Sequence, residues 1–109
     1  MNERRVPERL RALTYEDRVA ALEKAREARS MRARILERVR AGSMTLADVF
    51  ADPGSERIRV STLLRAVPGN GQRRVDYAFQ TVGIAPNRRV AGLGQRQRDA
   101  LVEMFDVVG

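Results

Sequence analysis

Residues 63–84 read LLRAVPGNGQRRVDYAFQTVGI, and this stretch decides the fold. Its apolar residues recur at helical spacing on both sides of the turn Pro68-Gly69-Asn70-Gly71. The spacing predicts one helix from Ser55 or Glu56 to Val67 and a second over residues 73–82, ended by Gly83. An ordinary helical hairpin with a glycine turn has the same pattern, so the pattern by itself indicates fold rather than function.

The rest of the chain also has helical patterns and no strand alternation, which predicts an all-α fold. Thr14 and Asp17 begin a helix that nothing interrupts before Gly42. A short helix follows over residues 45–50, and a last helix over residues 95–107. We therefore expect a charged tail (1–13), a long basic helix (14–42) and a compact multi-helix body (43–109).

The predicted core contains residues from the C-terminal half of the long helix and from each later helix. It consists of Met31, Ile35, Val39, Leu46, Val49, Phe50, Ile58, Leu63, Leu64, Val67, Val75, Ala78, Phe79, Val82, Leu101, Met104 and Phe105.

The long helix has two apolar faces rather than one. Tyr15 and Leu22 share the first face, and Ile35 and Val39 lie roughly opposite at about 100° per residue. Its C-terminal half is therefore expected to pack on the core. Arg18, Arg26 and Arg29 lie away from the core face, and they form either a solvated surface or a second contact.

Composition points to a polyanionic partner. The chain has 109 residues and a formal net charge of +7, and Lys24 is its only lysine among 21 basic residues. Arginine is suited to forked contacts with phosphate, although codon composition would also enrich it. A basic balance of this size is typical of proteins that bind DNA, RNA or an acidic membrane.

Several classes of function are excluded. Histidine and cysteine are absent, which removes the usual zinc sites, thiol chemistry and the commonest general base. The acidic residues are scattered singly, so we expect no catalytic pair, no metal and no cofactor. No apolar run approaches the length of a membrane span, and we expect a cytoplasmic protein without a membrane partner.

Three glycine-containing turns are flanked by arginine, and they predict a phosphate-binding surface. They lie at residues 68–74, 83–89 and 92–98. A helix that begins after such a turn offers free N–H groups and a positive dipole end to an anion. A nucleotide-binding P-loop does not fit, because the Gly-Lys-Ser/Thr ending is missing and the turn follows a helix.

The hairpin resembles the helix–two-turn–helix elements of ribosomal protein S13 and of DNA repair glycosylases. Nearly the whole chain is similar to the actinobacterial integration host factor family. The segments that carry this resemblance are residues 20–25, 59–64, 68–71, 84–89 and, above all, GLGQRQRDAL at 92–101.

The resemblance implies a monomeric, nucleoid-associated protein that binds duplex DNA with little sequence preference, bends or compacts it, and assists site-specific recombination with a phage integrase. It implies no enzymatic activity. Together with the turns, it gives as DNA-binding candidates Arg59, Ser61, Gly69, Asn70, Gly71, Gln72, Arg73, Arg74, Arg88, Arg89, Gly92, Gly94, Arg96 and Arg98, with Arg18, Arg26 and Arg29 as a second contact.

Two alternatives remain open at the level of sequence. An RNA-binding, ribosome-associated protein would use the same S13-like hairpin, but exposed aromatics for stacking bases are scarce, with Tyr15 and Tyr77 the remaining candidates. A protein-interaction adaptor built on the long helix would leave the arginine-flanked turns unexplained.

Overall fold

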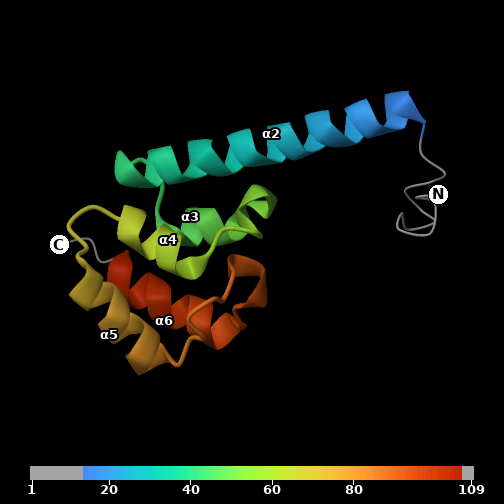
Figure 1. Cartoon of the computed structure of the whole chain (residues 1–109). Helices are drawn as coiled ribbons and strands as arrows, with labels where there is room; N and C mark the ends of the chain where they lie inside the picture. The colour runs from blue at the N-terminus through green and yellow to red at the C-terminus, as the bar shows by residue number, and fades with distance from the viewer. Residues whose placement is uncertain (1–13, 107–109) are drawn as a thin grey trace. The chain divides into compact units, whose positions relative to one another are not determined.

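The computed structural model describes residues 14–106, so the expected tail (1–13) and Val107 lie outside the described residues. Along the chain the elements are α2 (Tyr15–Arg40), α3 (Leu46–Ala51), the 3-10 helix η2 (Pro53–Ser55), α4 (Val60–Ala66), α5 (Gln72–Val82), the 3-10 helix η3 (Val90–Gly92) and α6 (Gln95–Phe105) (Figure 1). The all-α class is confirmed. Residues 14–106 contain no β-strand, only an isolated antiparallel bridge between Arg59 and Arg89.

The chain forms two compact units, Met1–Ser30 and Met31–Gly109, and α2 contributes to both. As predicted, α2 begins with a reciprocal cap: the Thr14 N–H donates to Asp17 Oδ2 and the Asp17 N–H donates to Thr14 Oγ1, each at 3.1 Å. Gly42, at φ 75°, ends the helix. Although α2 has 26 residues, no helix in the described part of the chain is apolar enough over a sufficient length to cross a membrane.

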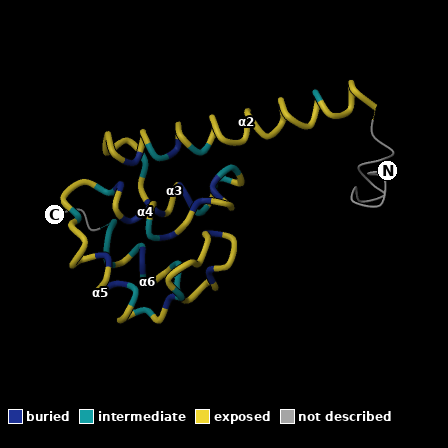
Figure 2. Tube along the Cα trace, in the orientation of Figure 1, coloured by how far each residue is buried: buried dark blue, intermediate teal, exposed yellow. Residues whose placement is uncertain are grey.

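The core lies within the second unit, where α3 packs on α6, α6 on α5, and α5 on α4 (Figures 1 and 2). Its buried residues are Ile35, Val39, Leu46, Val49, Ile58, Val60, Leu63, Leu64, Ala66, Val75, Ala78, Ile84, Val90, Leu93 and Leu101.

Most of the predicted core is confirmed, with differences at its margin. The aromatic residues Phe50, Phe79 and Phe105 are only partly buried. Met31 is 47% exposed, but its side chain lies over Gly54, where an added Cβ would come within 2.7 Å of the Met31 sulfur.

The predicted start of the helix before the turn was wrong, because α4 begins at Val60 rather than at Ser55 or Glu56. The Ser55 hydroxyl is buried and donates to the carbonyl of Val49 at 2.7 Å, which ends η2 in a turn. The backbone after it pairs with a distant segment: the Val60 N–H donates to the Arg88 carbonyl at 2.9 Å. Long-range pairing of this kind leaves no local periodicity in the sequence.

The N-terminus of α3 is closed by two separate caps. Thr45 and Asp48 form a capping box, and the hydrogen bond from the Thr45 backbone N–H lowers the pKa of the Asp48 carboxyl. The Asp106 carboxylate, from just beyond α6, accepts the N–H groups of Leu46 and Ala47 at 2.8 and 2.9 Å. Asp106 therefore ties the end of α6 to the start of α3.

We expect Asp106→Ala to destabilise the fold by about 1–2 kcal/mol, because it leaves two α3 amides without their acceptor. Urea unfolding followed by circular dichroism measures the change.

The matched control is Asp99→Ala on α6, where the carboxylate is exposed and accepts only from the Gln95 side chain four residues earlier. That variant should stay within about 0.5 kcal/mol of the wild type. Equal losses in the two variants would mean that Asp106 does not join α3 to α6.

Candidate nucleic-acid interface

The turn between α4 and α5 is held by Gly69 and Asn70. Gly69 takes the left-handed conformation, at φ 83°. The Asn70 N–H donates to the Val67 carbonyl at 3.2 Å, and its side-chain amide donates to the Leu64 carbonyl at 3.0 Å. The amide of Asn70 therefore caps the end of α4, which leaves it less free to contact a ligand.

Gly71 differs from the expectation that it also needs a positive φ. Its φ is −96° and its ψ is 175°, an extended conformation that any residue adopts. It precedes α5 without a side-chain cap, so the amides of Gln72 and Arg73 face outward at the positive end of the helix dipole. A Cβ added at Gly71 would meet no protein atom within 4 Å, so the approach to these amides is open.

The three polar residues after the turn, Gln72, Arg73 and Arg74, are all exposed, and two of them are also bonded within the protein. Arg74 donates to the Met104 carbonyl at 3.0 Å and lies 5.3 Å from the centre of the Phe105 ring. The Gln72 side-chain amide donates to the Asp76 carboxylate at 2.8 Å.

The bridge between Arg59 and Arg89 brings two predicted segments together. The Val60 N–H donates to the Arg88 carbonyl and the Val90 N–H donates to the Ile58 carbonyl, both at 2.9 Å. Arg59, Arg88 and Arg89 are all exposed, so the start of α4 and the start of η3 form one basic patch.

Gly92 has a local role inside this patch. An added Cβ there would come within 2.6 Å of Arg88 Cδ, so the Arg88 side chain lies against the glycine. Arg89 donates to the carbonyl of Arg57. The 3-10 helix η3 and these contacts therefore give residues 84–94, between α5 and α6, a defined conformation.

The start of α6 contains one exposed arginine and one that braces the fold. The Gly94 N–H donates to Gln97 Oε1 at 3.0 Å, and an added Cβ at Gly94 would have ordinary clearance. Arg96 is exposed. Arg98 is half-buried and donates to the carbonyls of Leu93 and Val90 at 3.2 and 3.3 Å, with its guanidinium 5.7 Å from the Phe50 ring centre.

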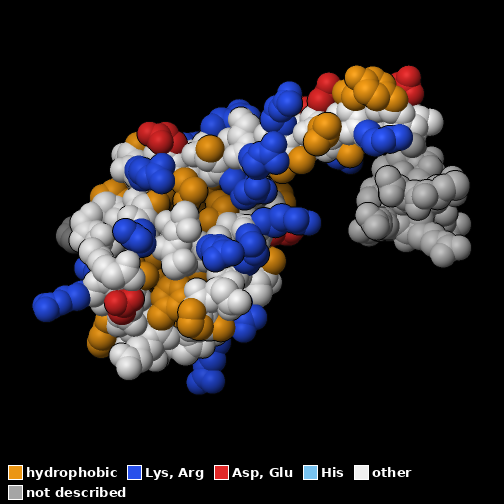
Figure 3. Space-filling model, viewed as in Figure 1, with side chains coloured by type: hydrophobic (Ala, Val, Ile, Leu, Met, Phe, Trp, Pro, Cys, Tyr) orange, Lys and Arg blue, Asp and Glu red, His pale blue; other side chains and the backbone are white. Residues whose placement is uncertain are grey.

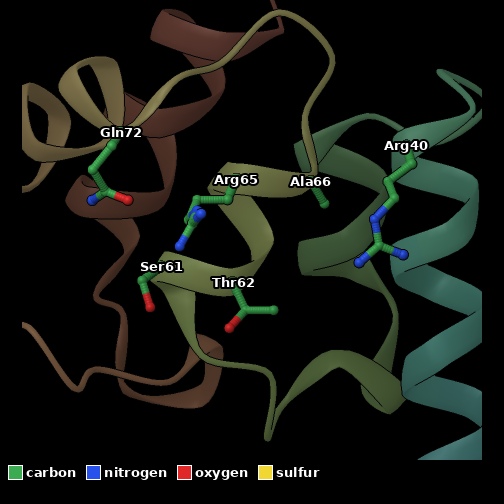
Figure 4. Close-up of a pocket in the computed structure, with 6 residues that line it drawn as sticks. All are labelled: Arg40, Ser61, Thr62, Arg65, Ala66 and Gln72. Atoms are coloured by element: carbon green, nitrogen blue, oxygen red, sulfur yellow. The ribbon is translucent and has the colours of Figure 1, made fainter.

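A polar pocket of about 570 Å³ adjoins the turn (Figure 4). Ser61 and Gln72, both predicted, line it together with Arg40, Thr62, Arg65 and Ala66, which the sequence reasoning did not select. Arg65 lies four residues after Ser61 and three after Thr62, and this spacing on one helix face is a signal that could have identified it. Arg40 joins this group only through the tertiary fold.

Basic side chains are spread over the face of the second unit that Figure 3 draws, and acidic ones are few and separate. In the first unit, Arg18, Arg26 and Arg29 are all exposed on α2. No group of three or more acidic side chains among residues 14–106 is placed to hold a metal ion.

This chain is similar to a known domain family and to several known proteins that share one name. The family described as S13-like H2TH domain matches residues 39–105. An integration host factor of Mycolicibacterium smegmatis is 43% identical over 86% of this chain and 93% of that protein. An integration host factor of Streptomyces coelicolor is 38% identical over 89% of this chain and 94% of that protein.

A solved structure of similar fold is described as sIHF bound to an 8bp palindromic DNA. Its TM-score is 0.69 at 33% identity, over 76% of this chain and 98% of that chain.

Proposed function

The chain belongs to the integration host factor family and contains an S13-like H2TH domain, and from this premise we propose that it is an architectural protein that binds duplex DNA. As a member of this family it is not an enzyme. Duplex DNA is favoured over RNA because the structural neighbour is bound to DNA. In addition, the exposed aromatic residues among those described are limited to Tyr15 and Tyr77.

The observation that carries this proposal is the open start of α5. Two backbone amides lie beside the exposed guanidinium of Arg73, and Gly71 leaves room for a phosphate to approach them. The basic patch of Arg59, Arg88 and Arg89, with Arg96 on α6, gives further exposed positive charge for the same backbone.

The binding is proposed to be largely independent of sequence. The two amide side chains of the turn, Asn70 and Gln72, are already bonded to the Leu64 carbonyl and the Asp76 carboxylate. Arginines on phosphates position a protein without reading bases. Any preference would come from groove width and from flexible base steps.

The candidates are proposed to divide into three groups. Arg59, Arg73, Arg88, Arg89 and Arg96 contact phosphate, whereas Arg74 and Arg98 chiefly hold the fold that presents them. The remaining candidates of the turns and of the start of α4 contribute backbone or small side chains: Ser61, Gly69, Gly71, Gly92 and Gly94.

At the level of the cell, the protein is proposed to act as a monomer in the nucleoid, bending or compacting DNA and assisting a phage integrase in recombination. The body, residues 43–109, provides the main DNA contact. The long helix, residues 14–42, provides a second one through Arg18, Arg26 and Arg29.

The salt dependence of affinity tests the proposal. If several exposed arginines each displace a counterion, log affinity for a short duplex should fall with log salt at a slope of roughly −4 to −7. Fluorescence anisotropy at stepwise salt concentrations measures this slope. A slope near −1 would mean that the positive charge is only a solvated surface.

Gly71→Val should lower duplex affinity by about tenfold while leaving a folded protein, because its side chain points into open space and covers the α5 amides. Gly69→Ala should instead lower the stability of the protein and leave its duplex affinity unchanged. Its positive φ makes the variant less stable by about 1 kcal/mol, but the amides stay uncovered.

Thermal unfolding and anisotropy on both variants separate the two effects. Wild-type affinity in a folded Gly71→Val protein would remove the start of α5 from the site.

The second contact is tested by changing Arg18, Arg26 and Arg29 together to glutamine, which keeps helix propensity while removing three charges. Binding to a short duplex should be largely retained, whereas condensation of long DNA should weaken, because compaction needs a second surface. Atomic force microscopy of long DNA measures the condensation. Unchanged condensation would make the helix a scaffold only.

A further inference from the structure

The pocket beside the turn has a lining that suits an anion. Its six lining residues come from the last turn of α2, from α4 and from the start of α5, and none of them is acidic. Figure 4 shows Arg40 and Arg65 on opposite sides of Ala66, with the hydroxyls of Ser61 and Thr62 on the same side of α4.

The sequence of α4 builds one wall of this pocket. Leu63 and Leu64 are fully buried, which turns Ser61, Thr62 and Arg65 toward the opposite, open side of the helix. Ala66 is 7% exposed, and its small side chain leaves room above it. The volume of about 570 Å³ is larger than a single phosphate group needs.

Arg40 forms the opposite wall, and its ion pair is weak. Its guanidinium lies 3.4 Å from Glu37 one turn earlier, and the two side chains are 54% and 76% exposed. An exposed pair of this kind contributes little, so an anion with more charge can take the guanidinium from the carboxylate.

The start of α5 adds a fixed positive field. Gln72 lines the pocket and is the first residue of α5, where the helix has no side-chain cap. Residues that carry two guanidinium groups and two hydroxyls, together with the first residue of α5, therefore line one pocket from three elements.

We propose that this pocket is a second phosphate seat, in which Arg40 and Arg65 bind the phosphate oxygens from two sides and Ser61 and Thr62 donate their hydroxyl protons. The seat takes either a phosphate of the DNA backbone, which rests on the proposed function, or a free phosphate anion. In the first case the DNA backbone crosses the exposed face of α4, from the turn between α4 and α5 to the C-terminal end of α2.

The DNA arm compares two charge-matched double variants on a short duplex. Arg40→Gln/Arg65→Gln should lower affinity about tenfold and make the salt slope shallower by about 1–2, because two arginines lose their phosphate. Arg32→Gln/Arg34→Gln removes the same charge from α2 outside the pocket, and it should change affinity by no more than about twofold.

A second variant tests the competition for Arg40. Glu37→Gln removes the carboxylate that pairs with Arg40, so it should raise affinity about two- to threefold in the wild type and have no such effect in an Arg40→Gln background. An equal gain in affinity in both backgrounds would mean that Glu37 acts only through net charge. Arg40 would then not be part of the proposed phosphate seat.

The free-phosphate arm titrates inorganic pyrophosphate into the full chain and follows the backbone amides of Thr62, Ala66 and Gln72 by NMR. Saturable shifts that disappear in Arg40→Gln/Arg65→Gln, with unchanged duplex affinity, would assign the seat to a free phosphate anion. A loss of duplex affinity in Arg40→Gln/Arg65→Gln, relative to its control, would assign the seat to a phosphate of the DNA backbone.

If the pocket variant matches its control in both arms, the seat is refuted, while duplex binding by the wild type would leave the proposed function intact. If the wild type does not bind duplex DNA at all, the proposed function falls, and the pyrophosphate titration alone decides whether the pocket binds phosphate.

Discussion

The burial of α4 is the constraint on which the rest of the structure depends. Val60, Leu63 and Leu64 have no exposed surface, and burying each contributes about 1.5–3 kcal/mol. When these three side chains are buried in the core, the start of α4 lies against η3 and its end leads directly into the turn at Gly69. The polar residues of α4 then face outward. Two parts of the proposed interface, the start of α4 and the turn at its end, take their position from this seven-residue helix.

Arginine has two distinct physical roles in this chain. Arg74 and Arg98 donate to the Met104, Leu93 and Val90 carbonyls and lie over aromatic rings, so they act as braces within the body. A guanidinium is suited to this because it holds several donors in one rigid plane. The other arginines are then presented by a fold that Arg74 and Arg98 stabilise. A basic composition therefore overstates the charge available to DNA.

The interface is built from backbone as much as from side chains. Gly69 supplies the left-handed turn, Asn70 caps α4, and Gly71 keeps the next amides open. The two caps of α3, from Thr45 and Asp106, satisfy its N-terminal amides. The two helix starts thus differ, because that of α3 is closed by the protein's own acceptors and that of α5 has no side-chain cap.

The sequence by itself determined the all-α class, the reciprocal cap at Thr14 and the turn around Gly69, because each of these is visible as a local pattern. It also identified most of the core helix positions, since apolar spacing reports which helix face is buried. The start of α4, the bridge from Arg59 to Arg89 and the cap by Asp106 required the tertiary structure, because each joins residues about 30 to 60 positions apart and leaves no periodic signal. The same holds for the pocket, which Arg40 and Arg65 line together only after the core has packed. It also holds for the identity of the bracing arginines, Arg74 and Arg98, which depends on the carbonyls that the fold brings within reach.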